Sequence, residues 1–543
     1  MTTPCTDLPP GRPGSRAASR TLHPMSNEQR ISIQSLSDDV FCLIFNEFHA
    51  NYSAGGANKL GWVTPSHVCS RWRRILVDDC ATLWARSLCT FPKALPIFVE
   101  RVRDAMLTIR IDEAHLGHET AIGFIEMKES RDTLLDVIKQ RSQQIQTIDI
   151  TFPSIPQSYT TPADVAARRN MIPMLFKAEV LSGLMRKTLP YLQELRLIGP
   201  PLSGMNGSAP LSSKTAFVAP KLVCLELFHV QISAETLYNV LRNAPRLETL
   251  TIQWAGRDAT TMSTDIQHLS EPLPLARLVN ASLGGRQARL IDFLPLWRLI
   301  LAHERVRLHV LVSPSTGDEG ESSLVALAPW LQRTGGDMLS FSIATDRIGF
   351  AIASSTSTVL DPNPYLHFEF GDMIPGAGLF PRLLSRFITS VHPANIHVLD
   401  LDAEIIIREN ITGQLEHLSA VRELRVVFGL EVAPLFILHD IIEIIPEIPP
   451  FFPALRTLVL KGTVTDWSTI WLSQGTGMLS NALQSRREAG FPVSKLILRG
   501  VGIGSQDERT QIDVMAQHVD EFVDERQHVG WDMAEFEASR EFL

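Results

Sequence analysis

The stretch 221-KLVCLELFHVQISAETLYNVLRNAPRLETLTI-252 contains the unit that recurs through most of this chain. Its first residues alternate, so that Leu225 and Leu227 share one face of a short strand. The segment after Ser233 has apolar residues at helical steps, and Pro245 ends it before a second strand pattern begins. The stretch therefore predicts a strand, a helix and a strand in succession.

The apolar spacing L-x-x-L-x-L of this stretch occurs eight times along the chain. Three successive copies begin at residues 192, 222 and 247, which gives steps of 30 and 25 residues. These steps are close to the repeat length of leucine-rich-repeat proteins, about 20–29 residues, and the chain resembles that class. The eight copies are Ile145/Ile148/Ile150, Leu192/Leu195/Leu197, Leu222/Leu225/Leu227, Leu247/Leu250/Ile252, Ile396/Leu399/Leu401, Val421/Leu424/Val426, Leu455/Leu458/Leu460 and Val493/Leu496/Leu498.

This resemblance implies a curved solenoid whose parallel strands line an open inner face, with the apolar stripes of the helices buried behind them. The repeats are degenerate, because the Asn that often follows the last apolar position is replaced by residues such as Pro200 and Val230. From about residue 256 to 390 the spacing weakens, and VRLHVLV, MLSFSI and YLHFEF are predicted strands joined by longer loops. We expect the arc to bulge or to be interrupted there.

Two segments near the N-terminus have helical periodicity instead. In 36-LSDDVFCLIFNEF-48, Ser37 is placed to cap a helix whose apolar residues recur at steps of three and four. In 62-WVTPSHVCSRWRRILVDDCATLW-84, Trp72 belongs to an apolar helical face. The three arginines of the RWRR run are interpreted as a solvated face rather than a phosphate-binding one. These segments predict a small three-helix module over residues 31–90.

The order of LSDDVFCLIF, HVCSRWRRI and LW resembles the F-box-like module that is expanded in higher fungi. Ser37 stands where most members of that family carry Pro. The resemblance implies that the module docks on the Skp-type linker subunit of a cullin ubiquitin ligase. The residues that it assigns to linker binding and to the core of the module are Leu36, Val40, Ile44, Phe45, Val68, Cys69 and Trp72.

The composition narrows the possible classes of protein. A chain of 543 residues, 45% of them hydrophobic, can bury a large core in more than one folded unit. Residues 505–543 contain eleven Asp/Glu and three Arg, so they carry −8 of the net charge of −9, and a general nucleic-acid-binding field is not expected. Residues 1–30 predict a disordered arm without the apolar core of a secretory signal. We expect a soluble intracellular protein, cytoplasmic or nuclear, because no uninterrupted apolar stretch suffices for a membrane span.

Motifs for catalysis and metal binding are missing from the sequence. The six cysteines include no CxxC pair, so they are interpreted as small buried hydrophobes. His115 and His118 form a possible metal pair whose third ligand the spacing does not supply. The GVGIG run at 500–504 departs from the dinucleotide-binding pattern and predicts a turn. We therefore predict no catalytic residue, no metal and no cofactor.

The acidic C-terminal region has a helical pattern of its own. Ile512, Met515, Val519 and Phe522 follow one another at steps of three or four residues. They predict an acidic amphipathic helix within residues 505–543 that ends before Gly530. Because the last repeat of a solenoid exposes an apolar flank, we expect this helix to cover it rather than to recruit a basic partner.

These observations favour a non-catalytic adaptor with two binding surfaces. Residues 31–90 would bind the Skp-type linker, and an irregular leucine-rich-repeat solenoid over 91–504 would bind a target protein. In an alternative interpretation the protein is a scaffold outside any ligase, and its helical module only caps the solenoid. An enzyme is a third interpretation, which would require a polar pocket with convergent titratable groups. Neither a nucleic acid nor a membrane is an expected partner.

Overall fold

A computed structural model describes about three fifths of the chain, from the first predicted helix to the acidic C-terminal region. The predicted arm over residues 1–30 and the His115/His118 pair lie outside the described residues. The described ranges are 33–52, 61–112, 127–151, 175–198, 216–228, 234–253, 275–284, 306–312, 317–332, 336–344, 347–353, 366–371, 379–402, 411–428, 450–462, 475–502 and 506–528, with a few single residues between them.

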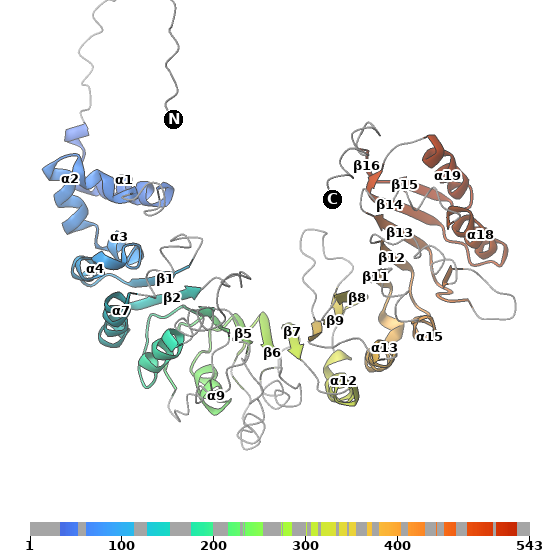
Figure 1. Ribbon diagram of the computed structural model, residues 1–543, viewed down its shortest axis with the longest axis horizontal. Coiled ribbons are helices and arrows are strands. Elements are labelled where there is room, and N and C mark those ends of the chain that lie inside the picture. Colours follow the sequence, from blue (N-terminus) through green and yellow to red (C-terminus); the bar gives the residue numbers. More distant parts are fainter. Residues whose placement is uncertain are drawn as a thin grey trace, which may run out of the picture.

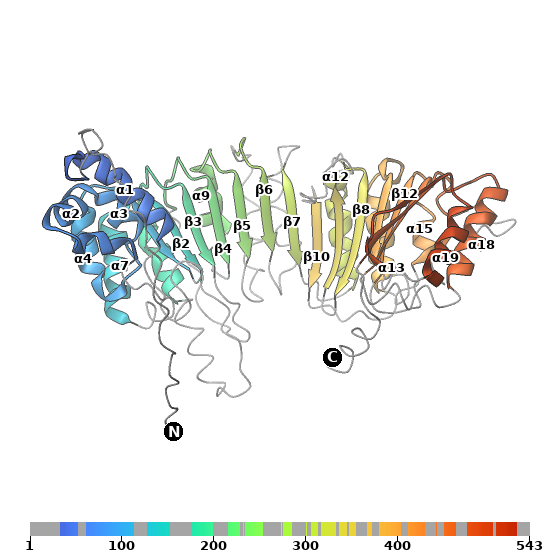
Figure 2. The ribbon, with the colours of Figure 1, turned by 90° about the horizontal axis from the view of Figure 1, so that it is seen from above.

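The described strands form one curved sheet of sixteen strands (Figures 1 and 2). Neighbouring strands are parallel except around β9, and from β1 to β7 they follow one another in chain order. The predicted α/β class is confirmed. The strands are β1 Leu107–Ile111, β2 Ile145–Thr151, β3 Glu194–Ile198, β4 Cys224–Phe228, β5 Thr249–Gln253, β6 Asn280–Gly284, β7 Arg307–Val312, β8 Met338–Ala344, β9 Arg347–Ala353, β10 Leu366–Gly371, β11 Val398–Asp402, β12 Glu423–Phe428, β13 Thr457–Gly462, β14 Lys495–Gly502, β15 Glu521–Asp524 and β16 Gln527–His528.

The last two apolar residues of each of the eight L-x-x-L-x-L copies lie in a strand, and all the apolar residues of the copies are buried. The copies are in register across the sheet: Leu195 pairs with Leu225, and Leu225 pairs with Leu250. Stacking of aliphatic side chains in rows removes the apolar face of every strand from water, which is the main driving force for this layer. The predicted strands therefore depend on one another for burial.

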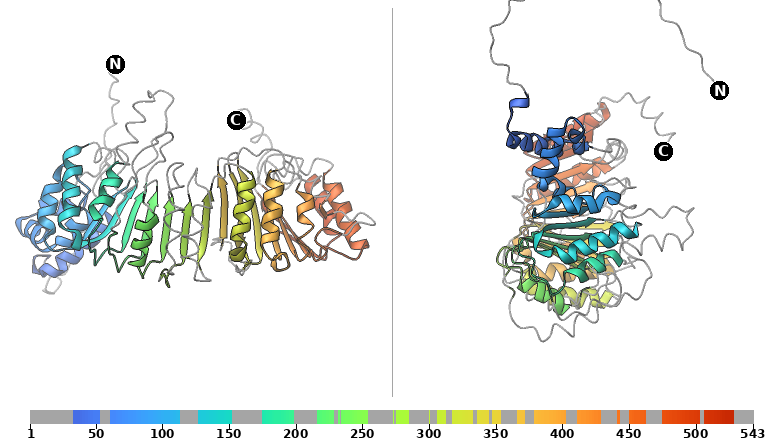
Figure 3. Two further views of the ribbon diagram at one scale, coloured as in Figure 1. Left: turned by 90° about the horizontal axis from the view of Figure 1, so that it is seen from below. Right: turned by 90° about the vertical axis from the view of Figure 1, so that its left-hand side faces the viewer.

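Helices cover the convex side of the sheet, and the concave side is open (Figures 1 and 3). The predicted helix after the Ser233 region is confirmed, and its Leu237, Val240 and Leu241 are buried. These helices supply the second apolar layer that a one-sided sheet requires. The helices behind the sheet are α7 Lys128–Gln140, α9 Ala234–Arg242, α12 Gly317–Leu331, α13 Leu379–Ser390, α15 Thr412–Leu415 and α18 Gly475–Glu488.

The weakly repetitive region does contain the three predicted strands, but their order in the sheet is unusual. Strand β10 pairs in parallel with β7, and β8 pairs in parallel with β11. Strand β9 lies between β10 and β8 and is antiparallel to both. Phe350 of β9 stacks on Phe380 and Phe387 of α13, at 5.7 and 4.9 Å between ring centroids. The sheet thus continues through this region without a gap between neighbouring strands.

The N-terminal helices pack directly on the first strands (Figure 3). The rings of Trp62, Trp84 and Phe98 form a chain with centroid distances of 4.9 Å at each step. Since Phe98 lies beyond residue 90, the predicted module boundary at that residue falls inside a continuous core. These elements are η1 Ile33–Ser35, α1 Asp38–Asn51, η2 Gly61–His67, α2 Ser70–Arg74, η3 Ile75–Asp79, α3 Ala81–Arg86, η4 Pro92–Ala94 and α4 Leu95–Val102.

The C-terminal region differs from the predicted single helix. Helix α19 (Gln506–Ala516) ends early, and Phe522 lies in strand β15, which pairs with β14. The edge of β14 offers unpaired backbone groups, and the N–H groups of Asp520 and Glu521 donate to the carbonyl of Ser494 at 2.9 Å. Hydrogen bonding at this sheet edge therefore overrides the helical pattern of the sequence. The buried residues of α19 and the turn after it are Ile512, Met515 and Val519.

We expect Met515→Ala to lower the free energy of unfolding by about 2–5 kcal/mol, because the Met515 side chain is fully buried behind the last strands. The matched control is Val514→Ala, since Val514 is 44% exposed and its truncation should cost less than about 1 kcal/mol. Urea denaturation of the two variants measures the difference. Equal effects of the two substitutions would contradict the packing of α19.

A fully buried arginine holds the C-terminal part of the arch together. The guanidinium group of Arg486, in α18, donates to the carbonyls of Phe451 at 3.0 Å and Phe452 at 2.9 Å. It also donates to the carbonyls of Ile442 at 3.3 Å and Phe491 at 3.2 Å. Burial lowers the pKa of Arg486 to about 10, so the side chain still carries its charge at neutral pH. One side chain thus satisfies backbone carbonyls from three segments of the chain.

The Arg486→Met variant leaves those carbonyls without their donor, so we expect a loss of at least about 3 kcal/mol in the free energy of unfolding. Arg487→Met is the control. The guanidinium of Arg487 pairs with Asp520 at the surface, and such pairs contribute about 0–1 kcal/mol to stability. Thermal or urea denaturation measures both. A loss at position 486 no larger than at 487 would show that the carbonyls find other donors.

Candidate docking surface on the N-terminal helices

Helix α1 begins at the residue that the sequence predicts. The hydroxyl of Ser37 accepts a hydrogen bond from the N–H of Val40 at 3.4 Å, and Ser37 has extended backbone dihedrals. Asp38 and Asp39 follow in the first turn, where negative charge is favourable next to the helix dipole. Ser37 therefore supplies a side-chain cap at this position, which Pro would not.

The apolar residues of α1 lie on two different faces. Phe41 and Phe45 are buried in the core of the module. Val40, Leu43 and Ile44 are exposed, and Leu43 is exposed by 69%. A helix in a monomeric domain usually turns only one apolar stripe to its core, so the second face has no partner within the described part of the chain.

Trp72 connects α2 to the buried face of α1. Its ring centroid lies 5.3 Å from that of Phe41 and 5.7 Å from that of Phe45. The indole is half-buried, so Trp72 contributes both to the core and to the surface. The backbone N–H of Trp72 is capped by the thiol of Cys69 at 3.5 Å.

The structure separates the residues that the F-box resemblance selects into three groups. Phe45 is a core residue, while Leu36 and Trp72 are half-buried. Val40, Ile44, Val68 and Cys69 are exposed, Val68 by 61%. Sequence reasoning missed two further exposed apolar residues, although Leu43 follows Val40 by three residues and could have been found from that step. They are Ile33, which is 53% exposed, and Leu43.

Arg71 fastens the segment before α1 to helix α2. Its guanidinium donates to the carbonyls of Gln34 and Leu36, both at 2.7 Å, and pairs with Asp38 at 2.6 Å. It also lies 5.0 Å from the centre of the Phe41 ring. This arginine positions the residues that lead into α1 rather than facing free solvent, which corrects the interpretation of the RWRR run as a solvated face.

The other two arginines of the run are exposed but also hold local contacts. Arg73 donates to the carbonyl of Ser66 at 2.9 Å. Arg74 pairs with Asp38 and, at 3.5 Å, with Asp79. The hydrogen bonds from Arg71 and Arg74 lower the pKa of Asp38 below its ordinary value of 3.8. The charges of the run are therefore largely compensated by carboxylates of the same module.

The five described cysteines have different surroundings. Cys80, Cys89 and Cys224 are buried, as predicted, whereas Cys42 is half-buried and Cys69 is exposed. The sulfur atoms of Cys42 and Cys80 lie 3.3 Å apart. Burial raises the pKa of Cys89 to about 12, so this thiol stays protonated at neutral pH. A thiol with such a high pKa is a poor nucleophile, which favours a packing role for Cys89.

Reactive groups elsewhere in the described chain are scattered. The hydroxyl of Ser282 lies 3.2 Å from Nδ1 of His309 on the concave face of β6 and β7. Lys177 is buried, which lowers its pKa to about 8, and it donates to the carbonyl of Phe228 at 2.9 Å.

Gly500 of the GVGIG run has φ 112°, and a side chain there would overlap the carbonyl oxygen of Gly462. Close approach of two strands accounts for glycine at this position.

No protein-family model matches the chain, and no curated protein is significantly similar to it. Among the described residues there is no group of three or more His, Cys, Asp or Glu side chains placed to hold a metal ion. None of the described helices combines the length and the apolar character needed to cross a membrane. The exposed apolar face of α1, together with the residues just before α2, forms the candidate functional site.

The lowered pKa of Asp38 gives its ion pairs a pH dependence of known sign. The unfolded carboxyl has the ordinary pKa of 3.8 and the folded one a lower value. The stabilisation is therefore fully present above pH 3.8 and is lost as the pH falls through the folded-state pKa. We expect the urea midpoints of the wild type and Asp38→Asn to differ at neutral pH and to converge in acid.

Asp104→Asn is the control for this titration, because Asp104 is exposed and forms no ion pair with another described residue. Its midpoint should follow that of the wild type at every pH. A difference between Asp38→Asn and the wild type that stays constant from neutral pH into acid would show that the carboxylate charge is not what stabilises this contact.

Proposed function

We propose that the protein is a substrate-recognition adaptor of a Skp–cullin–F-box type ubiquitin ligase. The helices α1 and α2 form an F-box-like module that docks on the Skp-type linker, and the curved sheet is a degenerate leucine-rich-repeat solenoid that binds a target protein. The single observation that carries the proposal is the second apolar face of α1, which stays exposed although Phe41, Phe45 and Trp72 already complete the core behind it.

The exposed face has the composition of a protein-binding surface. Val40 and Ile44 are one helical turn apart, and Leu43 lies between them on the same side of α1. Val68 precedes the N-cap of α2 and is exposed by 61%. Exposure of apolar residues to water is unfavourable, and covering them with a partner lowers the free energy. A second helical protein with a complementary groove is the partner that suits such a face.

The concave face of the sheet supports the second half of the proposal. Residues that point away from the buried rows are polar: Arg110 faces Asp149 at 3.7 Å, and Arg196 faces Glu226 at 3.7 Å. At the other end of the arch Lys495 pairs with Glu521 at 2.7 Å. A broad, curved, polar face is typical of solenoids that bind folded proteins.

Two separate binding surfaces are sufficient for the proposed activity without any chemistry in this chain. If the linker and the target are bound at once, the target is held at a high effective concentration near the ligase. The adaptor is therefore proposed to be non-catalytic and to need neither metal nor cofactor.

One observation favours a scaffold outside any ligase as the second candidate. The aromatic chain from Trp62 through Trp84 to Phe98 joins the N-terminal helices to the rest of the core. These helices therefore cover the first strand of the sheet whatever else they bind. In that interpretation the exposed face of α1 would bind a partner other than a Skp-type linker.

Leu43→Glu tests the ligase proposal more sharply than a change at Trp72, because Leu43 is exposed and its replacement leaves the core intact. We expect the affinity of the full chain for a purified Skp-type linker to fall at least about tenfold, since a buried charge would face the apolar partner. Calorimetric titration or copurification measures the affinity. Val325→Glu, at another exposed apolar residue far along the arch, is the control.

Two outcomes would contradict the proposal in different ways. If the wild type does not bind a Skp-type linker, the scaffold interpretation takes its place. If Leu43→Glu and Val325→Glu bind the linker as tightly as the wild type, the linker binds elsewhere and the exposed face of α1 has another partner.

A further inference from the structure

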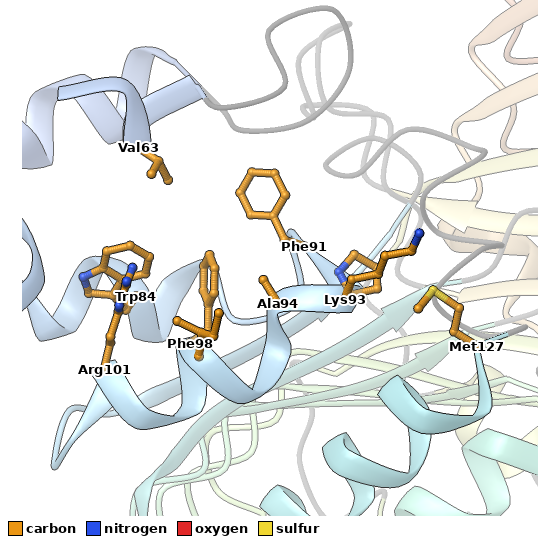
Figure 4. A pocket seen from close by; sticks show the side chains of 10 residues that line it. Val63, Trp84, Phe91, Lys93, Ala94, Phe98, Arg101 and Met127 are labelled. Atoms are coloured by element: carbon orange, nitrogen blue, oxygen red, sulfur yellow. The ribbon is translucent and has the colours of Figure 1, made fainter. Parts of the chain in front are cut away.

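A cavity lies among η2, α3, η4 and α4, next to the residue that precedes α7 (Figure 4). Its volume of about 550 Å³ is within the range of small-molecule sites, about 300–1,000 Å³. Side chains from η2, α3, η4 and α4 surround it, and Met127 closes one side. The lining residues are Val63, Trp84, Phe91, Pro92, Lys93, Ala94, Ile97, Phe98, Arg101 and Met127.

The wall of the cavity consists mainly of carbon. Trp84 and Phe98 meet edge to face at 4.9 Å, and Phe91 lies 5.8 Å from Phe98. The only polar atom of the Trp84 ring is already occupied, because its indole N–H donates to the carbonyl of Leu76 at 2.8 Å. The walls therefore offer apolar contact and no neutral hydrogen-bonding group from this ring, which selects a ligand with an apolar body.

The lining also contains two positively charged side chains, Lys93 and Arg101. The guanidinium carbon of Arg101 lies 4.3 Å from the centre of the Trp84 ring, and Lys93 is exposed. Neither forms an ion pair with another described residue, and none of the described lining residues carries a carboxylate. The net charge of the lining is therefore positive, although the chain as a whole carries −9. An anion is therefore attracted to this site, although the negative charge of the chain as a whole would repel it.

We propose that this cavity binds a small amphiphilic anion, a carboxylate with an alkyl or aromatic body. The apolar body lies against Phe91, Ala94 and Ile97, above the buried rings of Trp84 and Phe98. The carboxylate pairs with Arg101 or Lys93 at the margin. The arrangement is independent of the ligase proposal, because no residue of the exposed α1 face lines the cavity.

The position of the cavity gives such a ligand a structural effect. Val63 belongs to η2 beside α1, whereas Met127 leads into α7 behind the first strands. A ligand that touches both sides adds contacts between η2 and the start of α7. Binding to the folded state alone raises its stability by mass action, so the melting temperature should increase with ligand concentration.

The test is calorimetric titration of the full chain with decanoate, with decanol as the uncharged probe of equal chain length. We expect saturable binding of one decanoate per chain, at least about tenfold tighter than decanol, as one charge-assisted contact provides. The double variant Lys93→Met/Arg101→Met should bind the two probes equally. Lys461→Met, at an exposed lysine of β13 outside the cavity, should keep the preference of the wild type for decanoate.

A second pair of variants tests the location. Ala94→Trp places an indole in the cavity, and Ile97→Trp does so from a more exposed position that tolerates a large side chain. Either variant, once circular dichroism shows it folded, should bind decanoate at least about tenfold more weakly. Absence of saturable decanoate binding by the wild type, equal affinity for decanol, or unchanged binding by the folded Ile97→Trp variant would each overturn the proposal.

Discussion

Lateral burial of aliphatic rows is the constraint on which the structure depends. Ile150, Leu197, Leu227 and Ile252 occupy equivalent positions in four successive strands, and each is buried by the strands beside it and the helices behind it. No single repeat can bury its own apolar residues, so the layer is stable only as an array. The array in turn has two ends, and each end must be covered by something that is not a repeat.

The two ends are covered in different ways. At the C-terminal end α19 supplies buried residues such as Met515, and β15 satisfies the backbone of β14. At the N-terminal end the helices cover the first strand through Trp84 and Phe98. Because these helices use one face for the core, α1 keeps Leu43 and its neighbours exposed. The proposed docking surface and the proposed ligand cavity both result from this joint between helices and sheet.

The irregular middle of the sheet shows how far the repeat pattern extends. Strands β8 and β10 follow the predicted segments MLSFSI and YLHFEF, but β9 inserts between them with antiparallel pairing. Its Phe350 packs on Phe380 and Phe387 of α13, so aromatic rings replace the aliphatic rows there. A local pattern of apolar residues predicts a strand but carries no information about which neighbour it pairs with.

The sequence by itself determined the strands with L-x-x-L-x-L spacing, the cap at Ser37 and the helix after the 221–228 strand, because these depend on residues close together in the chain. Only the tertiary structure decided which face of α1 is exposed, where Arg71 and Arg486 bind, and that the segment around Phe522 is a strand. Each of these results from contacts between residues far apart in sequence. The free backbone edge of β14 and the carbonyls around Arg486 exist only once the sheet has formed.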